Sequence, residues 1–184
     1  MKFVPARLAG LVVIEAPIYR DSRGLFRELH HAGRFADGGL TATFVQDNIS
    51  RSTRGVVRGL HYQIIQPQGK LVCALRGSVY DVAVDLRRSS PTFGEWFGVE
   101  LSGENGRSVY IPPGFAHGFC ALTDEADVLY KCTELYAPVH ERTILWNDPT
   151  LAIQWPLEGM SPIVSAKDQL GRPFTEAKTY DGVG

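Results

Sequence analysis

Short strand-like runs between glycine and proline turns dominate this sequence and leave little room for helices. In the run "KLVCALRGSVYDVAVDL", residues 70–86, apolar and polar side chains alternate through the second half, which is the period of a β-strand. Gly77-Ser78 in its middle predicts a tight hairpin between two strands. Further strand-like runs occupy residues 11–17, 24–29, 93–101, 108–122 and 126–138, whereas helix patterns are confined to residues 31–39 and the C-terminal region. Many short strands of this kind predict an all-β sandwich or barrel with a few short peripheral helices.

Length, charge and cysteine usage exclude several classes of protein. The 184 residues contain no internal linker or repeat and predict a single domain, residues 1–184. The net charge of −1 comes without any block of like charges, so a nucleic-acid partner is not expected. Cys73, Cys120 and Cys132 lie far apart and indicate neither a zinc site nor a disulfide framework. The N-terminal residues lack the apolar core of a signal peptide, and no run is long enough to span a membrane. We therefore expect a cytoplasmic location and no membrane partner.

Two segments match the paired signature of the cupin jelly roll, the double-stranded β-helix. The second segment is the clearer one, because Gly106, Pro112, Gly114 and His117 follow the spacing G-x5-P-x-G-x2-H. The asparagine usually found four residues later is replaced by Ala121. The fold predicted from the strand pattern is therefore a jelly roll.

The first cupin segment has lost two of its metal-binding residues. Metal-binding cupins carry His-x-His here, and then a glutamate seven residues before a closing glycine. In this chain the segment begins at Gly55 and keeps His61, but Gln63 replaces the second histidine and Lys70 replaces the glutamate before Gly77. A divalent cation prefers histidine nitrogens and a carboxylate oxygen, and an ammonium a few ångströms away repels it by about 4 kcal/mol at an effective dielectric constant of about 20. We expect no bound metal and no cofactor.

A histidine and a lysine in one barrel suit the removal of a proton next to a carbonyl group. His61 titrates in the right range for a general base, and Lys70 can stabilise the enolate oxygen. The alternative is that His61 is a hydrogen-bonded structural residue, which is the commoner role of a lone histidine in a strand. A base also needs an orienting carboxylate, and the residues alone leave four candidates open: Asp47, Asp81, Asp85 and Asp168.

Reprotonation from the opposite face of a sugar ring needs a separate acid. Strand alternation puts Tyr130, Cys132, Glu134 and Tyr136 on one face, provided that the strand continues without a bulge. One tyrosine can then serve as the acid and the other as a stacking platform. Strand tyrosines are more often packing residues with a single hydrogen bond, and that alternative stands for each of them.

Longer motifs resemble one enzyme family in particular. The stretches "RGLHYQ", "QGKLV", "GSVYDVAVDLRRSSPTFG", "IPPGFAHGF", "LYKCTELYAP", "ILWNDP", "IQWP" and "SAKD" occur in the expected order between about residues 10 and 168. Together they resemble the dTDP-4-dehydrorhamnose 3,5-epimerase family. The resemblance implies a metal-free jelly-roll enzyme that inverts C3 and C5 of dTDP-4-dehydro-6-deoxy-D-glucose on the route to dTDP-L-rhamnose.

The same resemblance assigns the catalytic roles. It implies that His61 is the base, that Asp168 in "SAKD" is its carboxylate partner, that Tyr130 in "LYK" donates the proton and that Lys70 lies near the ketone. The resemblance therefore selects Asp168 among the four candidate aspartates. The spacing of residues in the sequence does not make this selection.

Ligand-contacting positions carry over in the same way. They are Arg23 and Glu28 in the stretch D-x-R-G-x-F-x-E, Gln46, Asp47 and Asn48 in "QDN", and Arg58, His117, Tyr136, Glu141 and Lys167. Arginine forks suit the diphosphate. Arg58 and His61 are three residues apart and would face opposite ways in a regular strand, although Gly59 between them would permit a bulge that changes this. The resemblance also implies a homodimer in which an N-terminal strand of one subunit, with Arg23 and Glu28, completes the nucleotide site of the other.

Three other functions compete with the double epimerase. The first is a single-centre epimerase or ketoisomerase acting on a related dTDP-4-keto-6-deoxysugar. The second is a metal-dependent cupin oxygenase, against which Gln63 and Lys70 argue. The third is a sugar-nucleotide binding protein without activity, against which the presence of both His61 and Tyr130 argues.

Overall fold

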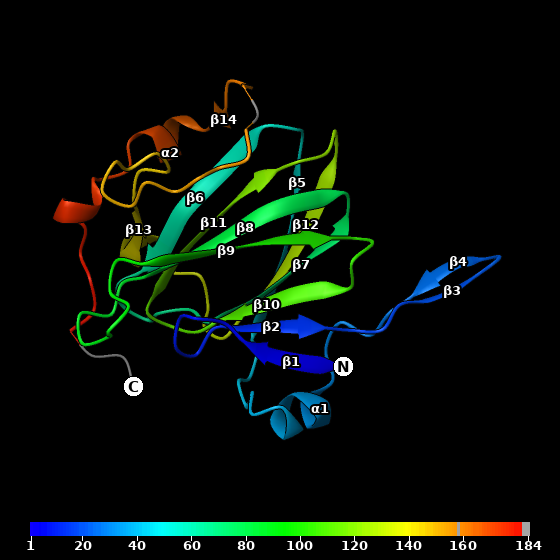
Figure 1. Ribbon diagram of the computed structural model, residues 1–184. Coiled ribbons are helices and arrows are strands. Elements are labelled where there is room, and N and C mark those ends of the chain that lie inside the picture. Colours follow the sequence, from blue (N-terminus) through cyan, green and yellow to red (C-terminus); the bar gives the residue numbers. More distant parts are fainter. Residues whose placement is uncertain (158, 182–184) are drawn as a thin grey trace.

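Two facing β-sheets and a projecting hairpin make up most of the computed structural model, which describes residues 1–157 and 159–181 (Figure 1). The first sheet has the strand order β1-β2-β10-β7-β12-β5. Its strands are β1 (Lys2–Pro5), β2 (Val12–Glu15), β10 (Arg107–Ile111), β7 (Lys70–Arg76), β12 (Ala126–Cys132) and β5 (Gln46–Ser52). All the pairings along this order are antiparallel, and β5 ends the order with one hydrogen-bonded neighbour, β12.

The second sheet has the order β13-β6-β11-β8-β9, and β14 adds to β6 in parallel. These strands are β13 (Glu141–Thr143), β6 (Val56–Gln63), β11 (Phe115–Ala121), β8 (Ser78–Asp85), β9 (Trp96–Ser102) and β14 (Ile163–Val164). The short helices are α1 (Ala32–Asp37) and α2 (Ala166–Gln169), with 3-10 turns at Pro138–His140 and Phe174–Glu176. This is the predicted cupin-type jelly roll with short peripheral helices, and the helix expected within residues 31–39 is confirmed as α1.

Strand alternation explains how the second sheet is buried on both faces. Along β8, Val79 and Ala83 point inward and join the main core between the two sheets. Val82 and Val84 point outward into a second apolar cluster. The residues that cover them come from the segment after β13 and include Ile144, Leu151, Ile153 and Tyr180. The C-terminal part of the chain therefore wraps the outer face of the sheet that carries His61.

The hairpin predicted at Gly77-Ser78 is wrong. Strands β7 and β8 follow each other around Gly77, yet β7 pairs with β10 and β12 whereas β8 pairs with β9 and β11. Gly77 has φ +66°, and a Cβ atom there would lie 2.0 Å from the carbonyl oxygen of Glu125. Glycine thus permits a sharp corner at which the chain leaves one sheet and enters the other. A glycine turn in the sequence therefore shows where the chain changes direction, but it does not show whether the two flanking strands pair with each other.

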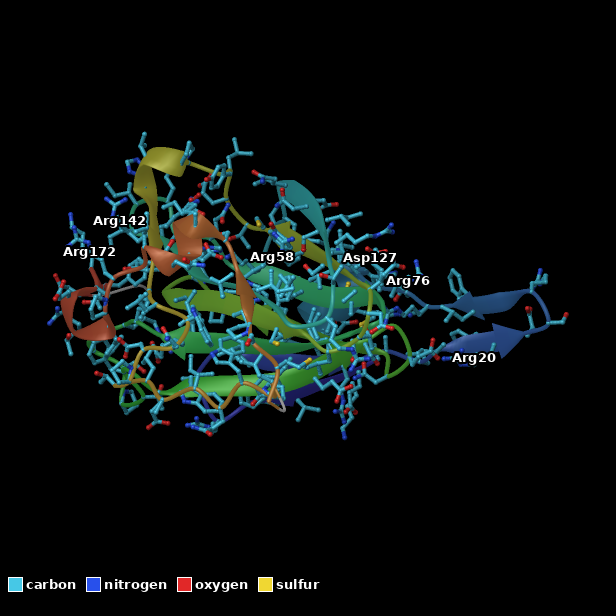
Figure 2. All side chains as sticks on the ribbon, turned by 90° about the horizontal axis from the view of Figure 1, so that it is seen from above. Arg20, Arg58, Arg76, Asp127, Arg142 and Arg172 are labelled. Atoms are coloured by element: carbon cyan, nitrogen blue, oxygen red, sulfur yellow. The ribbon has the colours of Figure 1, made fainter. Side chains whose placement is uncertain are left out.

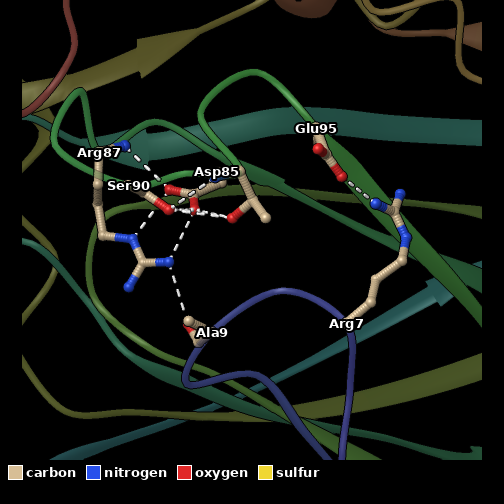
Figure 3. Close-up of polar contacts among 7 residues, drawn as sticks. Arg7, Ala9, Asp85, Arg87, Ser90 and Glu95 are labelled. Atoms are coloured by element: carbon tan, nitrogen blue, oxygen red, sulfur yellow. Dashed lines mark hydrogen bonds and ion pairs between the residues drawn. The ribbon is translucent and has the colours of Figure 1, made fainter.

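A buried carboxylate ties together the loop that joins β8 to β9. Asp85 is fully buried and accepts hydrogen bonds from the Arg87 guanidinium and from the hydroxyls of Ser90 and Thr92 (Figure 3). Burial alone would raise the pKa of Asp85, but these hydrogen bonds outweigh it and hold the pKa below its usual value. Arg87 also donates to the carbonyl of Ala9, so the network joins this loop to the N-terminal segment. Asp85 is therefore fully engaged away from His61.

The hairpin of β3 (Tyr19–Asp21) and β4 (Gly24–Phe26) extends away from the two sheets, at the right of Figure 1. Its aromatic side chains are exposed: Tyr19 is 62% and Phe26 is 68% exposed. Within the part of the chain that the structure describes, no helix has the length and apolar character needed to cross a membrane.

Candidate active site

A cavity of about 340 Å³ opens between the two sheets. Its walls come from β5, β6, β7, β11, β12 and β13, together with the loop before β7 and the segment that follows β12. The side chains that line it are Gln46, Asn48, Ser50, Arg58, His61, Tyr62, Gln63, Gln68, Lys70, His117, Phe119, Tyr130, Cys132, Tyr136 and Glu141, with Gly118 contributing backbone. Nine of the residues predicted from the sequence are in this set: Gln46, Asn48, Arg58, His61, Lys70, His117, Tyr130, Tyr136 and Glu141.

His61 and Asp168 lie in direct contact. The Nε2 atom of His61 is 2.7 Å from Oδ1 of Asp168, while Oδ2 accepts the backbone N–H of Gly59 at 3.2 Å. Asp168 is 4% exposed and sits in α2, whose first turn is capped by the Ser165 hydroxyl. Burial would raise the pKa of Asp168, but the hydrogen bonds from His61, Gly59 and Ser165 outweigh burial and lower it. Of the four candidate aspartates, Asp168 is thus the one that touches His61.

The bulge that Gly59 permits is present and turns both Arg58 and His61 toward the cavity. In the β6–β11 pairing, His61 faces His117 and Arg58 faces Phe119, so β6 has one residue more than β11 in this interval. The backbones approach closely, since a Cβ atom on Gly118 would lie 2.5 Å from the Arg58 carbonyl. Arg58 donates from Nε to the Ser52 hydroxyl at 3.0 Å. Figure 2 shows Arg58 over the body of the molecule, whereas Arg20 lies out toward the hairpin.

A second histidine–carboxylate pair lies beside the first. His117 is the cross-strand neighbour of His61, and its Nε2 atom is 2.8 Å from Oδ2 of Asp81. Both His117 and Asp81 are buried. Burial lowers the pKa of His117, against the opposing effect of Asp81. Asp81 therefore faces the barrel interior, on the same side of β8 as Val79 and Ala83.

Lys70 brings a positive charge into the cavity without a protein partner. It is 9% exposed, and among the described residues no hydrogen bond or ion pair engages its ammonium group. Burial lowers the pKa of Lys70, and the nearby Cys132, Asp81 and Glu141 compensate only in part. The two carboxylates already have partners, because Asp81 bonds His117 and Glu141 pairs with Lys167. Lys70 is thus free to bond an oxygen atom of a ligand.

Two tyrosines complete the cavity. Tyr130 lies on β12, and burial raises the pKa of its hydroxyl. Tyr136 lies beyond the strand and donates its hydroxyl hydrogen to Oε2 of Glu141 at 2.9 Å, a carboxylate that also pairs with Lys167. The prediction of a single strand face through Tyr136 is wrong, since β12 ends at Cys132 and Glu134 does not line the cavity. Tyr136 reaches the cavity from the following segment instead.

Four predicted ligand contacts lie outside the cavity walls of the single chain. Asp47 points to the other face of β5 from Gln46 and Asn48, and both its carboxylate oxygens lie 2.7 Å from Lys131 Nζ. Lys167 reaches the cavity only through Glu141. Arg23 lies in the projecting hairpin beside Asp21, and Glu28 pairs with Arg34. The roles of these four residues stay predictions.

Several cavity residues were missed by sequence reasoning. Ser50 continues the alternation of Gln46 and Asn48 along β5, so strand periodicity was sufficient to identify it. Phe119 likewise lies two residues after His117 on β11, so alternation was sufficient for it too, whereas Gln68 precedes β7 in a loop and no periodic pattern marks it. Within the described residues, no group of three or more histidine, cysteine, aspartate or glutamate side chains is placed to hold a metal ion.

Comparison with known proteins identifies the family. The family model described as dTDP-4-dehydrorhamnose 3,5-epimerase matches residues 5–176. The chain belongs to the dTDP-4-dehydrorhamnose 3,5-epimerase family. It is therefore an enzyme of the epimerase class, as predicted.

Individual members of this epimerase family match over nearly the whole chain. The dTDP-4-dehydrorhamnose 3,5-epimerase of Methanothermobacter thermautotrophicus is 52% identical over 180 residues, covering 97% of each chain. The Pseudomonas aeruginosa protein of the same name is 51% identical over 181 residues, covering 98% of this chain and 99% of its own. A crystal structure of dTDP-6-deoxy-D-glucose-3,5-epimerase from Legionella pneumophila, in complex with dTDP-4-keto-L-rhamnose, superposes with a TM-score of 0.92 at 50% identity, covering 96% of this chain and 94% of that one.

Proposed function

We propose that this epimerase inverts C3 and C5 of dTDP-4-dehydro-6-deoxy-D-glucose to give dTDP-4-dehydro-L-rhamnose, without a metal or other cofactor. The observation that carries the proposal is the His61–Asp168 contact of 2.7 Å at the wall of a cavity that also holds Lys70. Both carbons lie next to the C4 ketone, so the same chemistry serves both inversions.

The first step is proton abstraction by His61. With its Nε2–H donated to Asp168 Oδ1, the ring keeps a lone pair on Nδ1 for the substrate C–H proton. Asp168 then stabilises the imidazolium that forms. The electron pair of the C–H bond moves into an enolate, whose oxygen accepts a hydrogen bond from Lys70. A fixed positive charge held at this position stabilises the developing negative charge.

The second step returns a proton from the other side of the sugar ring. Tyr130 supplies it in this proposal, and the electron pair of the enolate forms the new C–H bond with inverted configuration. Tyr130 lines the cavity with a hydroxyl that burial keeps protonated well above neutral pH. Arg58 binds the diphosphate, and Gln46, Asn48, His117, Tyr136, Glu141 and Lys167 contact the rest of the substrate.

The proposal includes a homodimer with exchange of the β3–β4 hairpin. The exposed Tyr19 and Phe26 on this projecting hairpin need a partner surface. Val45 and Ile49 are also exposed, beside and along β5 at the end of the first sheet. In this assembly the hairpin of one subunit lies along β5 of the other. Its Arg23 and Glu28 then contact the nucleotide bound there, next to Asp47 of the β5 that it covers. Sedimentation should give a dimer that Phe26→Asp dissociates; a fully active monomer at micromolar concentration would contradict this assembly.

The domain and location predictions also belong to this proposal. One domain over residues 1–184 is supported by the family match to residues 5–176 and by strands from all parts of the chain in the same two sheets. A cytoplasmic location rests on the sequence alone.

The decisive experiment is incubation with dTDP-4-dehydro-6-deoxy-D-glucose in deuterated water, coupled to a reductase that traps the product. Deuterium at both C3 and C5 of an inverted product supports the double epimerase, and His61→Ala should abolish both. Exchange at one carbon only would indicate the single-centre enzyme. A folded wild-type protein that binds the substrate without exchange would be a binding protein and would refute the proposal.

A further inference from the structure

Gln63 occupies the position where metal-binding cupins carry their second histidine ligand, and it makes a different set of bonds. It lies on β6 two residues after His61 and is 3% exposed. Its Oε1 accepts the backbone N–H of Ala137 at 2.7 Å. Its Nε2 donates to the carbonyls of Gln66 at 2.8 Å and Leu135 at 3.3 Å. The amide therefore uses one acceptor and both donors on main-chain groups.

Two further glutamines bind the same segment. Gln46 on β5 accepts the N–H of Tyr136 at 2.8 Å, and Gln68 donates to the carbonyl of Glu134 at 2.8 Å. Residues 134–137 are thus each held by the side chain of a cavity glutamine. We call Gln46, Gln63 and Gln68 the glutamine clamp.

The clamp is the main support of this segment. Residues 134–137 follow the end of β12 and precede the 3-10 turn at Pro138–His140. In the described parts of the chain, residues 134–136 make no backbone-to-backbone hydrogen bond. Leu135 and Tyr136 are 58% and 49% exposed, so little packing holds them. A segment with few buried contacts opens easily unless polar bonds fix it.

We propose that Gln63 is a positioning residue, which acts through Tyr136 to form the sugar-binding wall of the cavity; this inference rests on the proposed function. Gln63 fixes the peptide groups on both sides of Tyr136, and Gln46 fixes its N–H. The hydroxyl of Tyr136 then reaches Glu141 at 2.9 Å, and its side chain forms part of the cavity wall. The residue at the position of the second metal ligand in other cupins thus holds residues 134–137, which include Tyr136 of the cavity wall.

The chemistry of the side chain explains why glutamine is required there. A neutral imidazole offers one donor and one acceptor, whereas a primary amide offers two donors and two acceptor sites. Histidine at residue 63 therefore leaves at least one of the three main-chain groups without its partner. All three hydrogen bonds are partly buried, and a main-chain group that loses its partner there costs free energy. Histidine at residue 63 would therefore weaken the anchor.

The test measures the segment directly and then its effect on catalysis. In Gln63→Leu, amide hydrogen exchange of residues 134–137 should accelerate by roughly tenfold or more, since each neutral hydrogen bond contributes on the order of a fivefold factor. KM for the keto sugar should rise about tenfold while kcat falls by less than about threefold, because the lost Tyr136 contact binds the sugar similarly in ground and transition states. The control is Gln154→Leu, which removes an exposed glutamine bonded to the Ala152 carbonyl.

A double-mutant comparison shows whether Gln63 acts through Tyr136. If it does, Gln63→Leu has little further effect on KM in a Tyr136→Ala background. An equal rise of KM in both backgrounds, or unchanged exchange in Gln63→Leu, would overturn the inference. If Gln63→Leu does not fold, Gln68→Leu replaces it, because this change frees only the Glu134 carbonyl. It should accelerate exchange and raise KM by smaller factors. Unchanged exchange and KM in Gln68→Leu would contradict the clamp equally. Failure of wild-type turnover would refute the proposed function. The hydrogen-exchange rates would still show whether Gln63 holds residues 134–137 in place.

Discussion

Replacing Lys70 by methionine should make the protein more stable and much less active. The two side chains have similar length, but methionine removes a buried ammonium that has no hydrogen-bond or ion-pair partner among the described residues. Exchanging buried charged groups for apolar ones of similar size is neutral or stabilises by about 1–4 kcal/mol. Since the cavity admits some water to Lys70, we expect about 1–2 kcal/mol, or roughly 2–8 °C in the midpoint of thermal unfolding.

The pH dependence of this gain has a definite sign. The pKa of Lys70 is lower in the folded protein than in the unfolded chain, where it is about 10.4. Between the two pKa values the unfolded state binds more protons, so wild-type stability rises with pH there and falls as the pH drops. The advantage of Lys70→Met should therefore be largest near neutral pH and shrink as the pH approaches about 10.

Calorimetry at several pH values, paired with the deuterium assay, tests both halves of this reasoning. Activity should fall by roughly 10²–10³-fold, the usual loss when one group that stabilises an oxyanion is removed. The control Lys2→Met removes an exposed lysine and should leave both stability and activity close to wild type. A Lys70→Met protein that is less stable than wild type at neutral pH, or that keeps near-normal turnover, would refute the reasoning.

Three further predictions concern other residues of the candidate active site. Asp168→Asn should lower turnover by roughly 10²–10⁴-fold, because His61 loses its orienting carboxylate. The pKa of Asp168 is lower in the folded protein than in the unfolded chain, so its ionised form stabilises the fold above about pH 4. This contribution is lost on acidification. The difference in unfolding free energy between wild type and Asp168→Asn should therefore shrink toward about pH 2. Tyr130→Phe should keep measurable deuterium exchange at C5 but lose most net inversion, and equal loss of both would count against Tyr130 as the acid. Gly118→Ala should destabilise the fold by about 1–3 kcal/mol in denaturant titrations, since its Cβ would lie 2.5 Å from the Arg58 carbonyl; unchanged stability would show that β6 and β11 can separate there.

The strands and the lining of the barrel were largely predictable because alternation reports which side chains point inward. Val79, Asp81 and Ala83 share a face by period, and the structure places them inside. The bulge beside Gly59 was allowed by the sequence but not determined by it, because strict alternation would have sent Arg58 and His61 to opposite faces.

Strand partners and remote contacts were not predictable from the residues alone. The corner at Gly77 has the local chemistry of a hairpin, and only long-range pairing decides that β7 and β8 separate. The contact of Asp168 with His61 joins residues 107 apart in the sequence, and no periodic pattern spans that interval. Family resemblance selected Asp168, and spacing did not. The glutamine clamp was missed because its bonds go to backbone groups, which every residue type has.

The wrapping of the outer sheet face by the C-terminal segment has a consequence for the order in which the site is assembled during synthesis. A ribosome releases the barrel strands through β13 before the segment that carries Asp168. Until that segment emerges, the outward-facing Val82 and Val84 lack their cover, and His61 lacks its carboxylate. Domains generally fold from the N-terminal side as they emerge. The nascent barrel therefore gains the carboxylate partner of its base last, and one docking event both shields its apolar surface and orients the histidine.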